Sequence, residues 1–314
     1  MGVAQTRVEI VQVRSLIASA STTPLHCNLH HSGVHVIDLG IIGGTGFYKF
    51  FENAGEEIVK TPYGDPSAPV TLATWEGKRI GFIPRHGLHH QHSPHRVPYP
   101  ANVAALKMLG ARQILGFNVV GSLSAKVSKG HFLLIDQFID LTWGRQWTIF
   151  DRPNGAHADL AEPYCGRLRS LANNALAGTP EIVHPNATAL IINGPRFQTK
   201  AESRLYNSWG VDVINMTQST EASVARELEM CYVNLSFCTD YGVISEELAP
   251  ESGDLPVRHQ DVVTYFNQNI DRVQSMVRST VAALDDDTEC GCRSVLERSW
   301  ANPNEQGNTG VDVP

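Results

Sequence analysis

The residues best suited to chemistry stand directly after apolar runs that are typical of strands. A glycine turn, residues 43–46, follows the run 34–42 and carries Thr45. Its backbone N–H groups and the Thr45 hydroxyl could hold an anion. It is not a dinucleotide fingerprint, because Lys49 stands where the third glycine should be, and Walker spacing is also lacking. Two interpretations stay open, a phosphate cradle or a tight turn without a ligand.

A second candidate anion group follows the apolar run 79–84. Arg85 offers a planar guanidinium whose N–H fork matches phosphate oxygens. His86 could add a second donor to the same anion. An ordinary surface pair is the alternative interpretation of these two residues.

Three more polar groups follow apolar runs, namely residues 193–197, 215–217 and 239–240. Each could be a helix cap or a turn when taken alone. Because ligands of open α/β sheets bind at the carboxyl ends of strands, the groups together predict one shared cleft.

Two clusters could suggest a metal, and neither has the usual spacing. The first cluster lies in a loop bounded by Pro94 and Pro98, and no carboxylate or cysteine that could complete a metal site is nearby. Its members are His86, His89, His90, His92 and His95. The second is Cys290-Gly-Cys292, which lacks Cys-x-x-Cys spacing. Six cysteines scattered over a long chain are typical of reduced thiols. We therefore expect no metal.

The composition limits the kinds of partner. The chain has 314 residues, of which 42% are hydrophobic and 18% charged, so it can form a substantial core. Its net charge is 25 − 32 = −7, and no long basic run is present, which argues against a nucleic-acid partner. No run of 18 apolar residues occurs, so no membrane-spanning segment is expected.

The elements that must position these groups alternate between strands and helices. Strands are expected over 34–42, 79–84, 113–120, 132–135, 190–192 and 231–237, and helices over 100–110, 221–230 and 260–284. This alternation predicts an α/β fold with a mostly parallel sheet and helices on both faces.

The chain divides into three regions. Residues 1–34 form an N-terminal extension, expected to be poorly ordered; a transit peptide is the alternative, weakened by Glu9 and by the lack of an amphipathic stripe. Residues 35–284 form one domain. Residues 285–314 lose apolar periodicity and are expected to be a disordered tail.

The motifs, taken together, resemble the trimeric purine nucleoside phosphorylases, and most of all their S-methyl-5′-thioadenosine phosphorylase branch. The resemblance covers residues 36–284 and leaves out both tails. It rests on Ile41-Ile-Gly-Gly-Thr-Gly46, Thr61-Pro-Tyr-Gly64, Arg85-His-Gly87, Gly121-Ser-Leu123, Asp136-Gln-Phe-Ile-Asp140, Gly194-Pro-Arg-Phe197, Ala201-Glu-Ser203, Asp212-Val-Ile-Asn-Met-Thr217 and Thr239-Asp240.

This resemblance implies a single α/β domain of the nucleoside phosphorylase type, with a mostly parallel, twisted mixed sheet flanked by helices. It implies phosphorolysis of a 5′-modified adenine nucleoside, such as S-methyl-5′-thioadenosine, to adenine and the 5-modified ribose 1-phosphate. Phosphate is then a co-substrate, and no metal or organic cofactor is needed. A cytoplasmic homotrimer that acts in purine salvage, without a nucleic-acid or membrane partner, is expected.

The resemblance also assigns the site. Phosphate would be held by Thr45, Arg85, His86, Asn118 and Thr217. Phe197 and Met216 would pack on sugar and base, and the catalytic Asp240 would meet N7 and the 6-amino group of the purine. His157 would come from a neighbouring subunit, near the 5′ end of the sugar.

Four positions depart from the family pattern. Gly242 replaces a second aspartate that the adenosine-type branch usually has, although Asp240 alone still favours a 6-amino purine. His259 aligns with an apolar position of methylthioadenosine enzymes and with a histidine that contacts the 5′-hydroxyl in enzymes for ordinary nucleosides. Asn118 and Gln198 stand where small hydroxyl residues near phosphate are more common.

Several alternatives therefore remain. The substrate could be 5′-halo-5′-deoxyadenosine or adenosine in a specialised pathway, or the enzyme could be a general or 6-oxopurine nucleoside phosphorylase. A nicotinamide oxidoreductase is disfavoured by the glycine spacing. A non-catalytic nucleoside-binding protein is disfavoured by the intact Arg85, His86 and Asp240.

Overall fold

The computed structural model describes residues 37–44, 51, 54–151, 155–242, 257–285, 290–302, 304, 306 and 309–311. The chain divides into two units, residues 1–33 and 34–314, and every described residue belongs to the second unit. The predicted N-terminal extension, residues 1–34, therefore lies outside the described residues.

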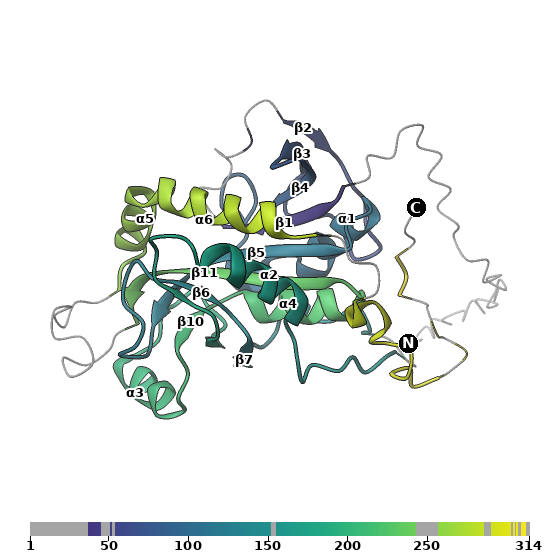
Figure 1. The fold of residues 1–314 in the computed structure, drawn as a ribbon. Helices are drawn as coiled ribbons and strands as arrows, with labels where there is room; N and C mark the ends of the chain where they lie inside the picture. Colours follow the sequence, from purple (N-terminus) through teal and green to yellow (C-terminus); the bar gives the residue numbers. More distant parts are fainter. Residues whose placement is uncertain are drawn as a thin grey trace, which may run out of the picture. The chain divides into compact units, whose positions relative to one another are not determined.

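The described part of the chain contains one sheet of eleven strands (Figure 1). Its main order is β2-β3-β4-β1-β5-β10-β9-β7, while β11 pairs with β5 and β6, and β6 pairs with β8. The strands are β1 Leu39–Gly43, β2 Gly55–Glu57, β3 Val70–Trp75, β4 Lys78–Pro84, β5 Gln113–Ser122, β6 Phe132–Leu134, β7 Gln137–Asp140, β8 Val183–His184, β9 Thr188–Ile191, β10 Val213–Asn215 and β11 Cys231–Tyr241.

Parallel pairing dominates this sheet. The pairs β1–β4, β1–β5, β5–β11, β9–β10, β7–β9 and β6–β8 are parallel. The pairs β2–β3, β3–β4, β5–β10 and β6–β11 are antiparallel. The predicted mostly parallel, mixed sheet is therefore confirmed.

Helices cover both faces of the sheet because its central strands are apolar on both sides. The helices are α1 Tyr99–Met108, α2 Gly166–Leu176, α3 Lys200–Ser208, α4 Gln218–Glu227, α5 His259–Gln268 and α6 Ile270–Ala283, with short 3₁₀ segments η2 Pro94–Arg96 and η3 Gly291–Ser294. In β5, Ile114 packs into the core that contains α1 and α4. Leu115 and Phe117 pack into the opposite core, which contains α2, α5 and α6. Alternate side chains on a strand point to opposite faces, so β5 holds the two layers together.

The long helix predicted over 260–284 is two helices, α5 and α6. The break is at Asn269, where the backbone leaves the helical region with φ −112° and ψ 15°. Its side-chain nitrogen donates to the Tyr265 carbonyl at 2.8 Å. An asparagine that bonds locally to the backbone in this way competes with helix continuation.

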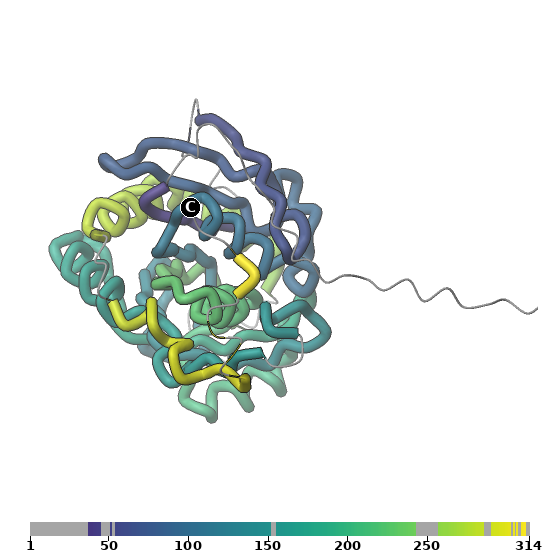
Figure 2. The backbone as a smooth tube through the Cα atoms, turned by 90° about the vertical axis from the view of Figure 1, so that its right-hand side faces the viewer, coloured from purple at the N-terminus to yellow at the C-terminus, as the bar shows by residue number. Residues whose placement is uncertain are grey.

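The C-terminal segment also differs from expectation, because residues 290–302 pack on the domain instead of forming a disordered tail. Cys292 and Leu296 are buried. Trp300 forms a β-bridge with Ala156 and an edge-on ring contact with Phe150 at 5.4 Å. Figure 2 shows this segment in yellow, beside teal and green parts of the chain. The spacing 292, 296, 300 places three apolar side chains one helical turn apart, a signal that the polar composition of the tail concealed.

Candidate active site

A cavity of about 600 Å³ opens at the carboxyl ends of β4, β5, β10 and β11. Eight of the predicted site residues line it: Arg85, His86, Asn118, Phe197, Met216, Thr217, Asp240 and His259. Thr45 lies outside the described residues, although its neighbour Gly44 lines the cavity. The predicted shared cleft is thus present, and it gathers side chains that are far apart in sequence.

Arg85 follows β4 and points inward as part of a buried ion pair. Its side chain pairs with Glu221 of α4 through Nε and through an Nη2–Oε2 bond of 2.9 Å. Nη1 donates to the Phe117 carbonyl at 3.0 Å, and Nη2 lies 3.3 Å from the Ile42 carbonyl and 3.4 Å from Asn118 Oδ1. Arg85 is 1% exposed, so the surface-pair interpretation is wrong. Among the described residues Nη1 has one acceptor for its two N–H groups, which leaves one for a ligand.

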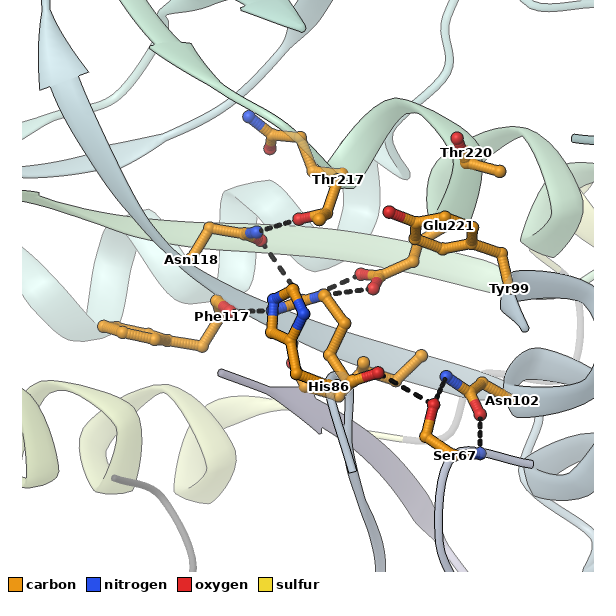
Figure 3. Close-up of polar contacts among 12 residues, drawn as sticks. Ser67, His86, Tyr99, Asn102, Phe117, Asn118, Thr217, Thr220 and Glu221 are labelled. Atoms are coloured by element: carbon orange, nitrogen blue, oxygen red, sulfur yellow. Dashed lines mark hydrogen bonds and ion pairs between the residues drawn. The ribbon is translucent and has the colours of Figure 1, made fainter. Parts of the chain in front are cut away.

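A second network fixes the Arg85 backbone (Figure 3). Ser67 Oγ donates to the Arg85 carbonyl at 2.7 Å and accepts from Asn102 Nδ2 of α1 at 2.9 Å. Asn102 Oδ1 in turn accepts from the Ser67 backbone at 2.8 Å. Arg85 is therefore held at both its backbone and its guanidinium, and reaches the cavity in a fixed position.

His86 also lines the cavity, and its protonation state decides which hydrogen bond it can make there. Its Nδ1 donates to the His92 carbonyl at 2.8 Å, because a carbonyl oxygen can only accept. Burial, with the Arg85 charge nearby, lowers the pKa of His86 to about 3. The ring is then neutral at pH 7, and Nε2 carries a lone pair instead of a hydrogen. In this state His86 Nε2 can accept a hydrogen bond from a P–OH group. Its predicted place at the phosphate stays a prediction.

Asn118 and Thr217 act together at the junction of β5 and α4 (Figure 3). Asn118 Nδ2 donates to Thr217 Oγ1 at 2.7 Å, and Asn118 Oδ1 accepts from Asn234 Nδ2 at 2.7 Å. Asn118 is thus oriented from both sides. Because the Thr217 hydroxyl accepts this bond, its own hydrogen remains available to an oxygen in the cavity.

Asn215 belongs to the predicted strand-end group 215–217, but the sequence assigned no role to its side chain. It lines the cavity, and its Oδ1 accepts from the Thr217 backbone at 3.0 Å. Its Nδ2 is buried without a partner among the described residues, as are both side-chain polar atoms of Gln218 and the Ser219 hydroxyl. These groups surround the N-terminus of α4, where the helix dipole favours an anion. The signal was available as an asparagine two residues before a helix start, but only the burial shows that its amide is unpaired.

Asp240 is positioned by an irregularity of β11. The register of β11 against β5 shifts between Cys238 and Asp240, which turns the Asp240 side chain towards the cavity. Asp240 Oδ1 lies 2.6 Å from where a Cβ on Gly121 would be, so only glycine fits at 121. Thr239 Oγ1 donates to Asp240 Oδ2 at 2.9 Å. Burial nevertheless raises the pKa of Asp240 to about 6, the range of a carboxyl that can both hold and release a proton near neutrality.

Gln198 lies beside Gly242, and its predicted place near phosphate stays a prediction. Its Nε2 lies 2.8 Å from where a Cβ on Gly242 would be, and the Ser122 carbonyl is 3.1 Å from the same point. Gln198 is buried and lines the cavity. The Gln198 carboxamide therefore occupies the space that the side chain of an aspartate at position 242 would need.

The apolar walls carry Phe197 and Met216, both half-buried. Gly194 approaches Met216 so closely that a Cβ would lie 2.6 Å from its Sδ, and its φ of 65° also favours glycine. Val262 and Phe266 of α5 complete the wall. A flat, apolar ligand surface fits between these side chains.

A row of imidazoles closes another part of the cavity. His86 stacks on His90 at 4.7 Å, and His90 lies 5.9 Å from His259, the first residue of α5. Burial, and then the neighbouring His259, lower the pKa of His90. His259 is exposed and lines the cavity, while its predicted place in the 5′ pocket stays a prediction. Residues 243–256, which include most of the variable loop before it, lie outside the described residues.

His157 does not line this cavity. It is exposed, and its backbone N–H donates to the Ser299 carbonyl at 2.8 Å. The predicted role from a neighbouring subunit stays a prediction. In the described ranges, no group of three or more metal-ligating side chains includes the clustered histidines.

The comparisons with known proteins agree with this geometry. Residues 38–282 match the family model of the phosphorylase superfamily. An S-methyl-5′-thioadenosine phosphorylase of Pyrococcus abyssi is 43% identical over 261 residues, which cover 82% of this chain and 97% of the relative. A purine nucleoside phosphorylase of Streptomyces coelicolor is 40% identical over 269 residues, 82% of this chain and 94% of the relative.

One solved structure is that of methylthioadenosine phosphorylase from Schistosoma mansoni in complex with adenine. It superposes with a TM-score of 0.78 at 31% identity and covers 84% of this chain and 99% of the other. No helix in the described ranges has the length and apolar character needed to cross a membrane.

Proposed function

This chain belongs to the phosphorylase superfamily, in its S-methyl-5′-thioadenosine phosphorylase branch, and on that premise we propose that it cleaves 5′-modified adenine nucleosides with phosphate. The products are adenine and the 5-modified ribose 1-phosphate. The observation that carries this proposal is one cavity with an anion-binding end at α4 and a carboxyl of raised pKa, Asp240.

The anion end suits phosphate. Thr217 can donate its hydroxyl hydrogen, Asn215 offers an unpaired Nδ2, and Arg85 offers one N–H. His86 Nε2 can accept the hydrogen of a monoprotonated phosphate. Together these three donors and one acceptor would hold the phosphate so that one of its oxygens faces the anomeric carbon of the nucleoside.

Asp240 suits the leaving group. Adenine presents N7 as an acceptor and the 6-amino group as a donor on the same edge. A protonated carboxyl matches both, because its O–H donates to N7 and its carbonyl oxygen accepts from the amino group. As the phosphate oxygen bonds to C1′, the C1′–N9 bond breaks, its electron pair passes to the purine, and the Asp240 proton moves to N7. Asp240 is the catalytic acid of this proposal.

The nature of the 5′ substituent depends on His259. Methylthioadenosine is the substrate that the branch indicates, and the wall of Val262 and Phe266 agrees with an apolar substituent. His259 in the same cavity favours a second candidate, adenosine or a 5′-halo-5′-deoxyadenosine.

A phosphate-dependent base-release assay tests the function. Methylthioadenosine, 5′-halo-5′-deoxyadenosine, adenosine and inosine are compared at equal concentration. We expect the 5′-modified adenosines to react faster than inosine. If none releases base when phosphate is present, the catalytic proposal is overturned. A preference for adenosine would assign the 5′ pocket to a polar substituent.

The assembly and compartment belong to the same proposal. We infer a homotrimer, supported by Trp143 and Trp147, which are 74% and 62% exposed although they are large apolar side chains. A neighbour that covers this surface would bring in its own His157. Among the described residues five cysteines are free, which agrees with a reducing compartment such as the cytoplasm and with a role in purine salvage there.

A further inference from the structure

Four cysteines that are far apart in the sequence meet at one point of the domain. Cys165, Cys231, Cys290 and Cys292, here called the cysteine quartet, have sulfur atoms that all lie within 4.8 Å of one another. They come from three places: the N-cap of α2, the first residue of β11, and the 3₁₀ segment η3 with its N-cap. The quartet is separate from the residues that line the active-site cavity.

The spacing of these sulfurs fits coordination of one ion better than it fits disulfides. Cys165 Sγ and Cys290 Sγ are 3.6 Å apart, and each quartet thiol is free. A disulfide bond is about 2.05 Å long. In a tetrahedral site with Zn–S bonds of about 2.3 Å, the sulfurs lie about 3.8 Å apart. Four thiolates this close also surround a single ion more readily than a polynuclear iron–sulfur cluster, which holds its ligands farther apart.

The surroundings compensate the charge that such a site would carry. A divalent ion with four thiolates has a net charge of two negative. Arg226 Nη1 lies 3.3 Å from Cys292 Sγ, so a guanidinium cation touches the quartet. Cations beside thiols favour the thiolate, which is the form that binds metal.

The quartet is also closed to solvent. Cys165, Cys231 and Cys292 are 3%, 0% and 7% exposed, and Cys290 is half-buried. Four protein ligands without an open position are typical of a structural metal site, not a catalytic one. An all-sulfur tetrahedral set selects zinc among the common divalent ions, because magnesium and calcium prefer oxygen.

We propose that the cysteine quartet binds one structural zinc ion per chain. Binding replaces the four S–H bonds by four Zn–S bonds and releases the thiol protons, with no oxidation. The sequence did not predict this site, because the ligands are separated by 65, 58 and 1 intervening residues instead of forming Cys-x-x-Cys pairs.

The ion would attach the C-terminal segment to the domain. The segment that starts at Cys290 continues to Ser299 and Trp300. The Ser299 carbonyl accepts a hydrogen bond from the His157 backbone, and Trp300 forms a β-bridge with Ala156. Zinc would therefore hold the backbone from which His157 projects. Its loss should loosen residues 290–302 while leaving the sheet and the cavity residues in place.

Metal analysis of the purified chain tests the proposal. The full-length protein is expressed with zinc in the medium, purified without a metal-affinity step and measured by inductively coupled plasma mass spectrometry. We expect about one zinc per chain, falling to less than about a tenth in Cys290→Ser/Cys292→Ser. Cys238→Ala is the matched control, since Cys238 is a buried cysteine outside the quartet and should keep the metal.

A second measurement does not depend on the variants folding. The wild-type chain is stripped with a chelator under a thiol-protecting reductant and titrated with cobalt(II). We expect the absorption bands of a tetrahedral tetrathiolate site, saturation at one cobalt per chain, and displacement by zinc with a rise in Tm. The proposal would be overturned if the chain bound neither zinc nor cobalt although a thiol titration showed that the four quartet cysteines were reduced. The proposal would also be overturned if mass spectrometry detected two disulfides among the quartet cysteines and the protein took up no metal after these disulfides were reduced.

Discussion

At the scale of single residues, the site separates into a rigid cation and a titratable acid. Arg85 is neutralised by Glu221 and held by backbone carbonyls, so in the proposed reaction it would position phosphate without changing its own charge. Asp240 is the group whose protonation can change near neutral pH, because burial raises its pKa to about 6. The pH response of catalysis should therefore come from Asp240.

The first prediction concerns the pH profile. If protonated Asp240 is the acid, kcat/KM with saturating phosphate should fall as pH rises through about 6, close to tenfold per unit above it. Asp240→Asn should lose about 10²- to 10⁴-fold in rate on adenine nucleosides, gain relative activity on 6-oxopurines, and lack this alkaline limb. Steady-state kinetics between about pH 5 and pH 8 provide the check. An identical limb in the Asn variant would remove Asp240 from the acid role.

The second prediction concerns selectivity for the base. Gln198 fills the space beside Gly242, so Gly242→Asp alone should clash and lower both stability and activity. Gly242→Asp combined with Gln198→Ser should restore room and raise the adenosine-to-inosine ratio of kcat/KM above that of wild type. Gln198→Ser alone is the control. Equal ratios in all three proteins would show that this pair does not contact the base.

At the scale of elements, α4 connects the parts of the site. Its N-terminus carries Thr217 and Gln218, and its first turn carries Glu221. Asn215 of β10 precedes this N-terminus, and the amide groups of Asn215 Nδ2 and Gln218 have no partner in the part of the chain that the structure describes. The β11 bulge before Asp240 supplies the opposite side. The distance between the acid and the anion site is therefore set by how α4 packs on β5 and β11.

The third prediction tests this packing. Glu221→Gln leaves the Arg85 guanidinium buried without a counter-charge, and should cost about 3–5 kcal/mol of unfolding free energy. Phosphate, as a replacement anion, should raise the Tm of this variant more than that of wild type. Glu227→Gln is the matched control, since Glu227 is also a buried carboxylate of α4 but bonds to Thr148 and the Ile149 backbone. Differential scanning fluorimetry with and without phosphate measures both effects. Equal phosphate responses of the two variants would contradict the prediction.

At the scale of the whole molecule, one chain provides the anion site and the base site, but His157 lies outside their cavity. In the proposed trimer a neighbour completes each site. The exposed Trp143 and Trp147 are then covered on assembly.

The fourth prediction uses subunit mixing. His157→Ala should raise KM for the nucleoside with little change in Tm, because the side chain is exposed within its own chain. Co-refolding His157→Ala with Asp240→Asn should recover activity, since some sites then take Asp240 from one chain and His157 from the other. Light scattering verifies the assembly. A fully active monomer, or no recovery in mixed assemblies of confirmed composition, would contradict the shared site.

The sequence by itself determined the α/β alternation and eight of the residues that line the cavity. Strand-end residues such as Arg85 and Asp240 could be named because the carboxyl ends of parallel strands meet at one edge. Asn118 lies inside β5 and was named only from the family resemblance. Local spacing also predicted the apolar strands, since their period does not depend on distant partners.

Only the tertiary structure decided the remaining properties, because they depend on contacts between distant segments. The neutral state of His86 follows from burial beside Arg85, and the unpaired Asn215 amide follows from the packing at α4. The Gln198 side chain can lie where it does only because Gly242 has no side chain. The cysteine quartet forms only when α2, β11 and η3 pack together, so no local spacing in the sequence could reveal it.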